Sequence, residues 1–443
     1  MANVRALALA SLARVHHGAF ATAVLHATIA REQLSAQERS MLTDIVYGTL
    51  RLEITLDACL APLLKRPDKL PAEVRDSLRL ASYEILFRET PRHAAVNEWV
   101  TLVKRRFRSL AGLVNAVLRR VSVPDNLSPA LRYGLPAWLF AEWEALFGAA
   151  RALNIAIGQS QAETLWLRSY HPQSLASLRA EGCDVRLGAL AHSLAVRPSK
   201  SLDSLQAFRQ GWVQPQNPSS SLAVLLLQPQ AEEYVLDLAS GNGIKAAQIA
   251  ASGARVHCVE QQAKKLERAQ SNLARLGLQA HFTQHDLRSP ADLPPAPKVL
   301  LDAPCSGSGT LRSHPELRHK LNPEGIEEAA ALQQQLLASA AQLTAPAGRL
   351  VYAVCALSAA EGQGAIASFL ERQPHFHHEP RDIHAEIATA NRNAPLFEGA
   401  ENERYDEQTL DIDYVATDYG YYIMPFAGMD GFFISSLRRD AST

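Results

Sequence analysis

The chain has 443 residues, of which 47% are hydrophobic and 20% are charged, and its formal net charge is −1. This composition is that of an ordinary globular protein, and the length predicts two or three domains. No segment approaches the roughly 20 apolar residues that a membrane span needs. The alanine-rich start is too interrupted by Arg14, His16 and His17 for a signal peptide. We therefore expect no association with a membrane.

The five cysteines are scattered along the chain, at Cys59, Cys183, Cys258, Cys305 and Cys355. None belongs to a CxxC pair, so the sequence predicts neither a disulfide framework nor a zinc site. The 15 histidines show no metal-ligand spacing, and no bound metal is expected. Unpaired thiols suit a reducing compartment, which favours a cytoplasmic location.

The charge is distributed unevenly. Residues 1–120 contain 18 Lys and Arg against 11 Asp and Glu, so this section is basic while the remainder is acidic. A basic section on a nearly neutral protein indicates a surface for a polyanion such as RNA. A solvated helical domain that is basic by chance explains the charge equally well, so both interpretations stay open.

Residues 1–125 are predicted to form an all-helical domain. Apolar residues recur there at helical spacing, for example at Leu78, Ala81 and Ile85. Short proline-containing breaks separate the helices. Three prolines between residues 121 and 136 then predict a linker.

A small α+β region is predicted over residues 136–218. It begins with an aromatic-rich amphipathic helix after Pro136 and continues with short strand-like runs such as residues 164–168. From residue 219 the pattern changes again, and residues 219–438 are predicted to form one further domain.

This last domain alternates strands with helices. Buried-type strands are predicted at residues 234–238, 255–259, 299–302 and 349–354, with helices at residues 245–251, 263–276 and 324–343. The rhythm predicts an α/β fold with a mostly parallel sheet and helices on both faces. Two C-terminal strands, residues 421–424 and 431–435, are expected to add an antiparallel pair at one edge. Residues 374–417 are expected to be rich in loops.

A DxxxGxG turn lies between the first of these strands and its helix. The turn and the start of the helix supply the candidate cofactor-binding residues Asp237, Ala239, Ser240, Gly241, Asn242, Gly243, Ile244 and Lys245. Glycines there let the backbone approach a ligand at the carboxyl end of the strand. An ordinary tight turn would have the same pattern. The prediction of a cofactor therefore also depends on the residues that follow the next strands.

The spacing of two acidic residues favours a nucleoside cofactor. Glu260 ends the next strand, where a carboxylate can bind both ribose hydroxyls. Asp286 follows the third strand, where it can meet an adenine amino group. The order fits S-adenosylmethionine at least as well as NAD. The third glycine of a dinucleotide motif is replaced by Ala246, which weakens the NAD interpretation without excluding it.

Two cysteines follow two other strands of the predicted sheet. Cys305 lies just after the strand ending at Asp302, and Cys355 ends the strand that starts at residue 349. A lone cysteine is usually an inert small hydrophobe, but two at the carboxyl ends of strands in one sheet can face one crevice. A thiolate that adds to carbon-6 of cytosine makes carbon-5 nucleophilic enough to accept a methyl group. An acid such as Asp302 near ring nitrogen 3 would favour the adduct.

The motifs at these positions resemble those of the Sun/Fmu-type family of RNA cytosine-5 methyltransferases. They are Asp-Ala-Pro-Cys-Ser-Gly at residues 302–307, the strand ending at Cys355, and Met-Asp-Gly-Phe-Phe at residues 429–433. In the first domain, residues 44–51 and 114–119 resemble the NusB-type RNA-binding domain that is fused to these enzymes. The resemblance covers nearly the whole chain.

The resemblance implies a Rossmann-like class I methyltransferase domain that uses S-adenosylmethionine. It implies that Cys355 is the nucleophile, that Cys305 assists product release, and that Asp302 and Lys245 lie at the active site, with Asp302 also near the cofactor. The implied partner is RNA, most naturally 16S rRNA, and a monomer is expected. A transfer-RNA substrate, or an RNA-binding ribosome-assembly protein without catalysis, are the alternatives.

Three segments depart from the family pattern, one of them being Gln-Asn-Pro-Ser-Ser at residues 216–220, where the family's Gln-Asp-x-Ala-Ser has an acid. The family's Ala-Pro-Gly-Gly-Lys turn is replaced here by Gly-Asn-Gly-Ile-Lys at residues 241–245, and its Thr-Cys-Ser by Val-Cys-Ala at residues 354–356. A β-branched residue such as Ile244 would crowd a backbone position that needs a positive φ. The general DxxxGxG pattern survives.

The densest basic run is Lys104-Arg105-Arg106-Phe107-Arg108. Its cations are candidates for contacts with RNA phosphates, and Phe107 for stacking on an unpaired base. The alternative is a solvated helix end with Phe107 packed inward. Arg312, just after the first cysteine motif, is a further candidate near the target base.

Overall fold

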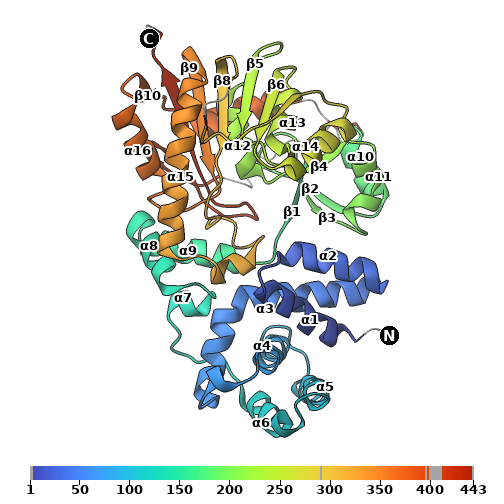
Figure 1. The fold of residues 1–443 in the computed structure, drawn as a ribbon. Helices are drawn as coiled ribbons and strands as arrows, with labels where there is room; N and C mark the ends of the chain where they lie inside the picture. Colours follow the sequence, from blue (N-terminus) through green and yellow to red (C-terminus); the bar gives the residue numbers. More distant parts are fainter. Residues whose placement is uncertain (1–2, 290–291, 395–396, 399–411, 442–443) are drawn as a thin grey trace. The chain divides into compact units, whose positions relative to one another are not determined.

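The computed structural model describes residues 3–289, 292–394, 397–398 and 412–441 (Figure 1). Its internal contacts divide the chain into two compact units. The first unit is Met1–Ala162 with Leu311–Lys320, and the second is Glu163–Thr310 with Leu321–Thr443. Each unit is described by itself below.

The first unit is helical, as the sequence predicts. Its helices are α1 (Val4–His16), α2 (Ala21–Glu32), α3 (Ala36–Leu60), α4 (Ala72–Leu86), α5 (Arg92–Lys104), α6 (Ala111–Arg120), α7 (Pro129–Arg132), α8 (Ala137–Phe147) and α9 (Ala149–Ser160). The compact units differ from the three predicted domains, because α8 and α9 cluster with the first unit rather than with the strands that follow. The predicted linker also contains α7, which packs on α3.

Local signals set the helix ends. Ser35 begins α3 with a capping box: its hydroxyl accepts a hydrogen bond from the Glu38 amide, and the Glu38 carboxylate accepts one from the Ser35 amide. Both orphan donors of the first turn are thereby satisfied.

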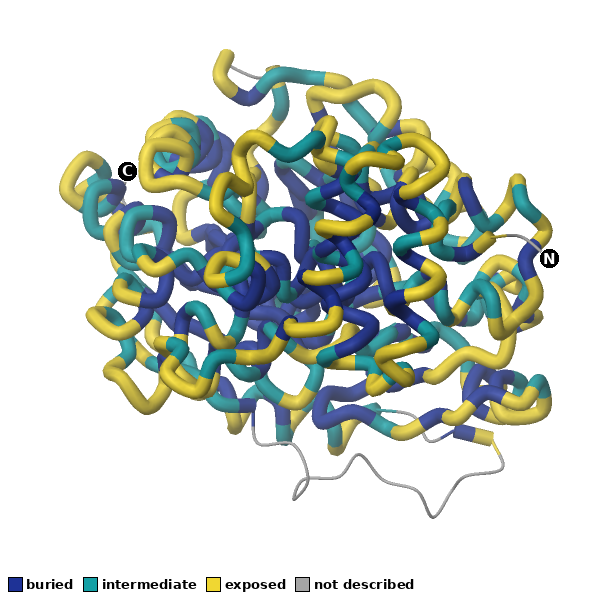
Figure 2. The backbone as a smooth tube through the Cα atoms, turned by 90° about the horizontal axis from the view of Figure 1, so that it is seen from below, coloured by how far each residue is buried: buried dark blue, intermediate teal, exposed yellow. Residues whose placement is uncertain are grey.

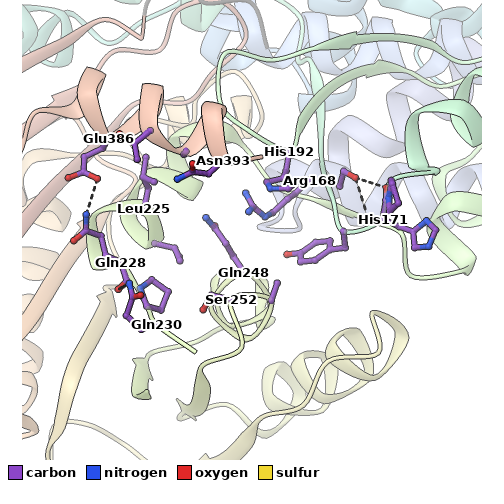
Figure 3. A pocket seen from close by; sticks show the side chains of 18 of the residues that line it. Arg168, His171, His192, Leu225, Gln228, Gln230, Gln248, Ser252, Glu386 and Asn393 are labelled. Atoms are coloured by element: carbon purple, nitrogen blue, oxygen red, sulfur yellow. Dashed lines mark hydrogen bonds between the residues drawn. The ribbon is translucent and has the colours of Figure 1, made fainter. Parts of the chain in front are cut away.

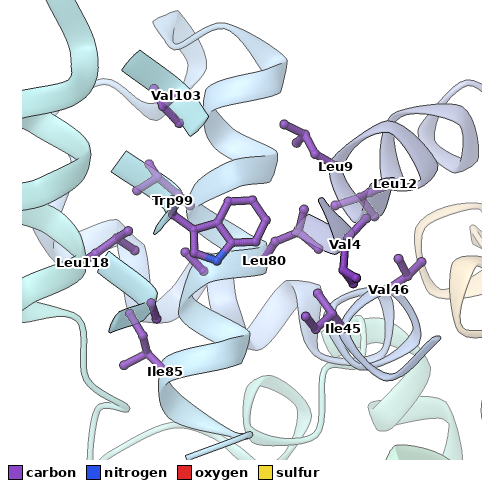
Figure 4. Close-up of a cluster of buried hydrophobic side chains, with 14 of the residues drawn as sticks. Val4, Leu9, Leu12, Ile45, Val46, Leu80, Ile85, Trp99, Val103 and Leu118 are labelled. Atoms are coloured by element: carbon purple, nitrogen blue, oxygen red, sulfur yellow. The ribbon is translucent and has the colours of Figure 1, made fainter. Parts of the chain in front are cut away.

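The core of the helical unit is built around Trp99 (Figure 4). The indole is fully buried, and its Nε1 donates a hydrogen bond of 2.8 Å to the carboxylate of Glu84. Arg5 forms an ion pair with the same buried carboxylate at 2.5 Å. The indole N–H of Trp99 and the carboxylate of Glu84 therefore both have partners. Without partners, burying these polar groups would be costly.

A second buried charge cluster lies beside α1 in the first unit. The imidazole of His16 contacts Glu53 at 3.0 Å and Asp76 at 3.2 Å. Burial alone would lower the pKa of His16, but the hydrogen bonds with the two carboxylates outweigh it and raise the pKa from 6.5 to about 9. The folded state therefore binds this proton more tightly than the unfolded chain does.

The raised pKa of His16 predicts a pH dependence of stability. The stabilisation is complete below the unfolded pKa of 6.5 and is lost as the pH rises through about 9. We expect a His16→Gln variant to lose roughly 1 kcal/mol at pH 6, after discounting for partial solvent exposure. Hydrogen exchange of the α1 and α4 amides at pH 6 and pH 9.5 measures this loss of stability. Equal sensitivity of the wild type and the variant to pH would contradict the assignment.

The second unit contains two sheets. The smaller is antiparallel, with the order β2-β3-β1-β4. Its strands are β1 (Leu165–Ser169), β2 (Asp184–Leu187), β3 (Ser193–Arg197) and β4 (Val213–Pro215), and the short helices α10 (Ser174–Ala180) and α11 (Gln206–Arg209) accompany them. The strand predicted at residues 164–168 corresponds to β1.

The larger sheet has nine strands among the described residues, and nearly all of them follow the order β11-β12-β13-β9-β8-β5-β6-β7. They are β5 (Tyr234–Leu238), β6 (Arg255–Glu260), β7 (His281–Gln284), β8 (Ala296–Asp302), β9 (Thr344–Val354), β10 (Phe376–His378), β11 (Tyr414–Thr417), β12 (Gly420–Ile423) and β13 (Phe432–Arg439). Strands β5 to β9 pair in parallel, and β10 to β13 pair antiparallel. The predicted parallel sheet with an antiparallel C-terminal pair is confirmed.

Helices connect and cover these strands. They are α12 (Pro218–Leu227), α13 (Ile244–Ala250), α14 (Ala263–Arg275), α15 (Pro323–Gln342), α16 (Gln363–Arg372) and α17 (Ile383–Asn393). One core cluster joins α12, α13 and α17 to alternate residues of β5, β8 and β9, and α15 packs on β8 and β9. Most residues of the central strands β5, β6, β8 and β9 are buried, and buried backbone fills the interior of the view in Figure 2 (dark blue).

The expectation that residues 374–417 are rich in loops is wrong for much of this stretch. It contains β10, α17 and β11, while residues 399–411 lie outside the described part. Phe376 of β10 is buried and meets Phe369 edge-on at 5.3 Å, and Ile383 of α17 is fully buried. Few apolar residues anchor these short elements, so their pattern in the sequence is weak.

Within the described residues, no helix combines the length and the apolar character needed to cross a bilayer.

Candidate active site

The candidate site lies where parallel strands of the large sheet end. Asp302 at the end of β8 pairs with Ala353 of β9, so the turns that follow the two strands emerge side by side. The end of β5 lies on the other side of β8. Parallel strands present their carboxyl ends at one edge, where α/β proteins bind ligands.

The two turns bring Cys305 and Cys355 together. Their sulfur atoms are 3.2 Å apart, and both cysteines are free and partly exposed. The contact with Cys355, burial of the sulfur, and nearby negative charge raise the pKa of Cys305 well above its usual value. A negative charge on one of these sulfur atoms disfavours a negative charge on the other, because two neighbouring thiolates would repel each other.

Gly309 permits the close approach of the segments that carry the two cysteines. A Cβ added to Gly309 would lie 2.1 Å from the carbonyl oxygen of Gly431. The Gly309 amide donates to the Cys355 carbonyl at 3.0 Å, and the Gly309 carbonyl accepts from the Gly431 amide at 2.8 Å. The glycines of two sequence motifs, 302–309 and 429–433, therefore meet through their backbones.

Lys245 and Asp302 form an ion pair beside the cysteines. The ammonium of Lys245 donates to Asp302 Oδ2 at 2.6 Å and lies 5.4 Å from the ring centroid of Phe432. The lysine side chain is 7% exposed, whereas that of Asp302 is 34% exposed. The carboxylate is thus held by a buried cation while remaining accessible to a ligand.

Asp237 at the end of β5 has the properties of a ligand-binding acid. It is fully buried, and neither of its carboxylate oxygens has a hydrogen-bond partner in the structure. Burial and the neighbouring charge of Asp302 raise the pKa of Asp237 to about 8. A buried polar group without a partner is costly, so a bound hydrogen-bond donor would stabilise this carboxylate.

The turn after Asp237 leaves room for a ligand. Gly241 adopts a φ of 58°, and a Cβ there would find its nearest neighbour only at 4.0 Å. Glu260 accepts hydrogen bonds from the amides of Gly241 and Gln262, both at 2.9 Å. Each carboxylate oxygen retains a second lone pair, which a ribose hydroxyl can use.

The remaining residues of the turn have distinct positions. Ala239 and Gly243 take left-handed conformations with φ of 57° and 76°, whereas Ile244 begins α13 and is not in the left-handed region. The isoleucine therefore causes no backbone strain at this position. Ser240 is buried and Asn242 is exposed.

Asp286 is already occupied by another side chain. Arg288 donates to both of its oxygens, and Gln261 Nε2 donates at 3.1 Å. The hydrogen bonds from Arg288 lower the pKa of Asp286 to about 2. A role of Asp286 at an adenine stays a prediction, and a ligand would have to share this carboxylate with Arg288.

The predicted RNA-binding residues differ in their exposure to solvent. Lys104, Arg105, Arg106 and Arg108 are exposed, although Arg106 also pairs with Glu73 at 2.6 Å. Phe107 packs against the helical core, as the alternative interpretation has it.

Arg312 is buried in the structure, and its role in RNA binding stays a prediction. The residue is 1% exposed, and its backbone amide donates to Gln159 Oε1 at 2.9 Å. A contact with an RNA phosphate would need this guanidinium to become exposed.

Sequence reasoning did not identify Glu361, which lies between β9 and α16. The side chain is fully buried and accepts hydrogen bonds from both the amide and the hydroxyl of Ser306, directly after Cys305. The only signal in the sequence is an acid six residues after Cys355, which alone indicates little.

A separate cavity of about 510 Å³ lies elsewhere in the second unit (Figure 3). Arg168, His192 and Gln248 line it, together with Gln228 before β5 and Ser252 after α13. These last two residues mark the amino end of the parallel strands. The cavity is therefore distinct from the cysteine site at the carboxyl end.

The fold and the site together define a Rossmann-like methyltransferase with a NusB-type helical domain. The family model of the 16S rRNA methyltransferase RsmB/F matches residues 224–438, and that of the NusB family matches residues 2–123. The chain belongs to the RsmB/F family.

Curated relatives align with nearly the whole chain. The ribosomal RNA small subunit methyltransferase B of Thermus thermophilus is 39% identical over 98% of this chain and 97% of its own. The probable enzyme of the same name from Bacillus subtilis is 29% identical over 99% of both chains.

Solved structures share the fold. The crystal structure of PH0851 matches with a TM-score of 0.79 and 20% identity over 99% of each chain. NSun6 from Pyrococcus horikoshii, determined with SFG, matches with a TM-score of 0.55 and 19% identity over 70% of this chain and 99% of that one.

The backbone contact at Gly309 predicts an effect of substitution. A Gly309→Ala change would force the two turns apart, and we expect the second unit to lose about 1–3 kcal/mol of stability. Urea unfolding followed by hydrogen exchange in β8 and β9 measures this loss. Gly112→Ala is the control, because a Cβ there meets nothing within 4 Å. Equal stability of the two variants would refute the contact.

Proposed function

We propose that the protein transfers a methyl group from S-adenosylmethionine to carbon-5 of a cytosine in 16S rRNA, with Cys355 as covalent nucleophile. The observation that carries the proposal is the pair of thiols 3.2 Å apart at the ends of β8 and β9. The names of the curated relatives support ribosomal RNA as the substrate.

The residues of the DxxxGxG turn fit S-adenosylmethionine. The unpartnered carboxylate of Asp237 suits a cationic hydrogen-bond donor, the open space above Gly241 admits a ligand, and Glu260 has free lone pairs for a ribose. When bound, S-adenosylmethionine supplies an electrophilic methyl group. The part of the chain proposed to hold it is the turn from Asp237 to Lys245, with Glu260, Asp286 and Asp302 around it.

The cysteines supply the nucleophile and its partner. The Cys355 thiolate forms a bond to carbon-6 of the cytosine, and the resulting electron density makes carbon-5 nucleophilic. After methyl transfer, a base accepts the proton of carbon-5. The electron pair of that C–H bond re-forms the double bond between carbon-5 and carbon-6, and the carbon-6–sulfur bond breaks, which returns the Cys355 thiolate. Cys305 lies at the right distance to assist this release.

Lys245 and Asp302 support the base. The accessible carboxyl group of Asp302 is proposed to hydrogen-bond near ring nitrogen 3, which stabilises the adduct. Lys245 fixes the orientation of that carboxyl group through the 2.6 Å contact. Such pre-organised electrostatic contacts lower the barrier because they need no rearrangement during the reaction.

The first unit is proposed to bind the RNA. Its exposed basic run at residues 104–108 supplies cations for phosphates. The match to the NusB family supports this role.

Trapping of the covalent adduct tests the proposed chemistry. A Cys305→Ala variant incubated with S-adenosylmethionine and 16S rRNA is expected to accumulate a protein–RNA adduct that resists denaturant, because release is impaired. The double variant Cys305→Ala/Cys355→Ala should form none. The adduct is measured as a shifted band on a denaturing gel. A folded single variant that binds cofactor and forms no adduct would overturn the mechanism.

Cofactor binding is tested at Asp237. An Asp237→Asn variant has no carboxyl group that can ionise when a cationic ligand binds, and we expect its affinity for S-adenosylmethionine to fall roughly tenfold, or about 1.4 kcal/mol. Isothermal calorimetry measures the affinity, and the exposed Asp203→Asn serves as the control. Wild-type protein that binds no S-adenosylmethionine would favour an RNA-binding protein without catalysis.

A further inference from the structure

Glu361 occupies an unusual place for a charged residue. It lies in the loop between β9 and α16 and is 0% exposed. No cation forms an ion pair with it within 4 Å among the described residues. A buried carboxylate without a cation is expensive, and it needs hydrogen bonds on its oxygens to remain charged.

Four hydrogen bonds to Glu361 meet that need. Oε1 accepts from the Ser306 amide at 2.7 Å and from Gln333 Nε2 at 3.2 Å. Oε2 accepts from the Ser306 hydroxyl at 2.5 Å and from the Ser358 hydroxyl at 3.0 Å. These donors come from the Cys305 turn, from α15 and from the loop that follows Cys355. One carboxylate thus connects the three segments that surround the sulfur pair.

The peptide units on both sides of Cys305 are fixed by this arrangement. Gln333 Nε2 also donates to the Pro304 carbonyl at 3.0 Å, before the cysteine, while Glu361 accepts from the Ser306 amide after it. Gln333 is itself fully buried. The carboxylate of Glu361 is therefore hydrogen-bonded to the turn of Cys305. Its hydrogen bond with Ser358 also connects it to the loop after Cys355.

The charge has a consequence for the sulfur pair. When the sulfur pair carries a negative charge, that charge is a single one, because two thiolates 3.2 Å apart would repel each other. The single negative charge goes to the sulfur with the more favourable surroundings. A fixed anion bonded to the residue after Cys305 disfavours a thiolate at Cys305.

We propose that Glu361 is a positioning residue that holds Cys305 as a neutral thiol and so directs the negative charge of the sulfur pair to Cys355. Cys305 then donates its S–H to the Cys355 thiolate. This inference rests on the proposed function for its importance in catalysis, but the charge distribution itself is a property of the protein without RNA.

Glu361→Gln is the decisive variant, because it removes the charge while keeping the shape. The glutamine carbonyl can still accept from Ser306 and Gln333, and its amide can donate to the two hydroxyls, which rotate freely. Ser358→Ala is the complementary variant, because it removes the two hydrogen bonds between the Ser358 hydroxyl and Glu361 and keeps the charge. Glu386→Gln is the matched control, a partly buried glutamate bonded to Gln228 and Arg381.

The readout is the rate of alkylation of each cysteine by iodoacetamide between pH 6 and 10, measured by peptide mass spectrometry. In the wild type we expect Cys355 to react roughly tenfold faster than Cys305 at pH 7.5. In Glu361→Gln the ratio should fall to about threefold or less, as the pH profile of Cys305 moves to lower pH. Ser358→Ala and Glu386→Gln should keep the wild-type ratio.

The outcomes separate this inference from the proposed function. An unchanged ratio in folded Glu361→Gln, or a wild-type Cys305 that reacts as fast as Cys355, overturns the role of Glu361. The second result is decisive even if the variant does not fold. The adduct of Cys305→Ala, with Glu361 intact, tests the function independently: an adduct with an unchanged ratio rejects only the inference, and a shifted ratio without an adduct rejects only the function.

Discussion

The site depends on a backbone contact between three segments that are far apart in the sequence. Gly309 donates to the carbonyl of Cys355 and accepts from the amide of Gly431, at a separation that no side chain on Gly309 would permit. The turns that carry the two cysteines are therefore fixed by main-chain hydrogen bonds. A sulfur pair positioned by the backbone needs less ordering during a reaction than one that depends on flexible side chains.

Much of the large sheet could be predicted because its strands are buried on both faces. Such strands appear as continuous apolar runs, as at Tyr234–Leu238, and glycine turns or helical patterns separate them. The short elements between residues 374 and 417 escaped prediction because a three-residue strand such as β10 has too few positions to show a period. Its place is set by pairing with β13, a long-range contact that the local sequence does not contain.

The candidate site was predictable to the extent that its residues follow strands. Cys305, Cys355 and Asp302 each end or follow a β-strand, and parallel strands bring such ends together. The order of strands along the sequence does not show which charged side chains are buried or which of them form pairs. Arg312 is of a residue type that often contacts RNA and is nevertheless buried. Glu361 belongs to no recognised motif, and yet it is hydrogen-bonded to the residue after Cys305.

Charge explains why a site with so many acids can remain folded. The buried cation Lys245 pairs with Asp302, and Asp237 senses the charges of Lys245, Asp302 and Glu260. Burial, together with the neighbouring negative charge of Asp302, raises the pKa of Asp237 to about 8, so near neutral pH this carboxyl group is largely protonated in the absence of a ligand. A positively charged donor at the turn would favour its ionised form, and binding would then release a proton. The same environment that disfavours ionisation of Asp237 therefore gives the turn affinity for a cationic ligand, whereas the carboxylate of Glu361 accepts hydrogen bonds on both oxygens.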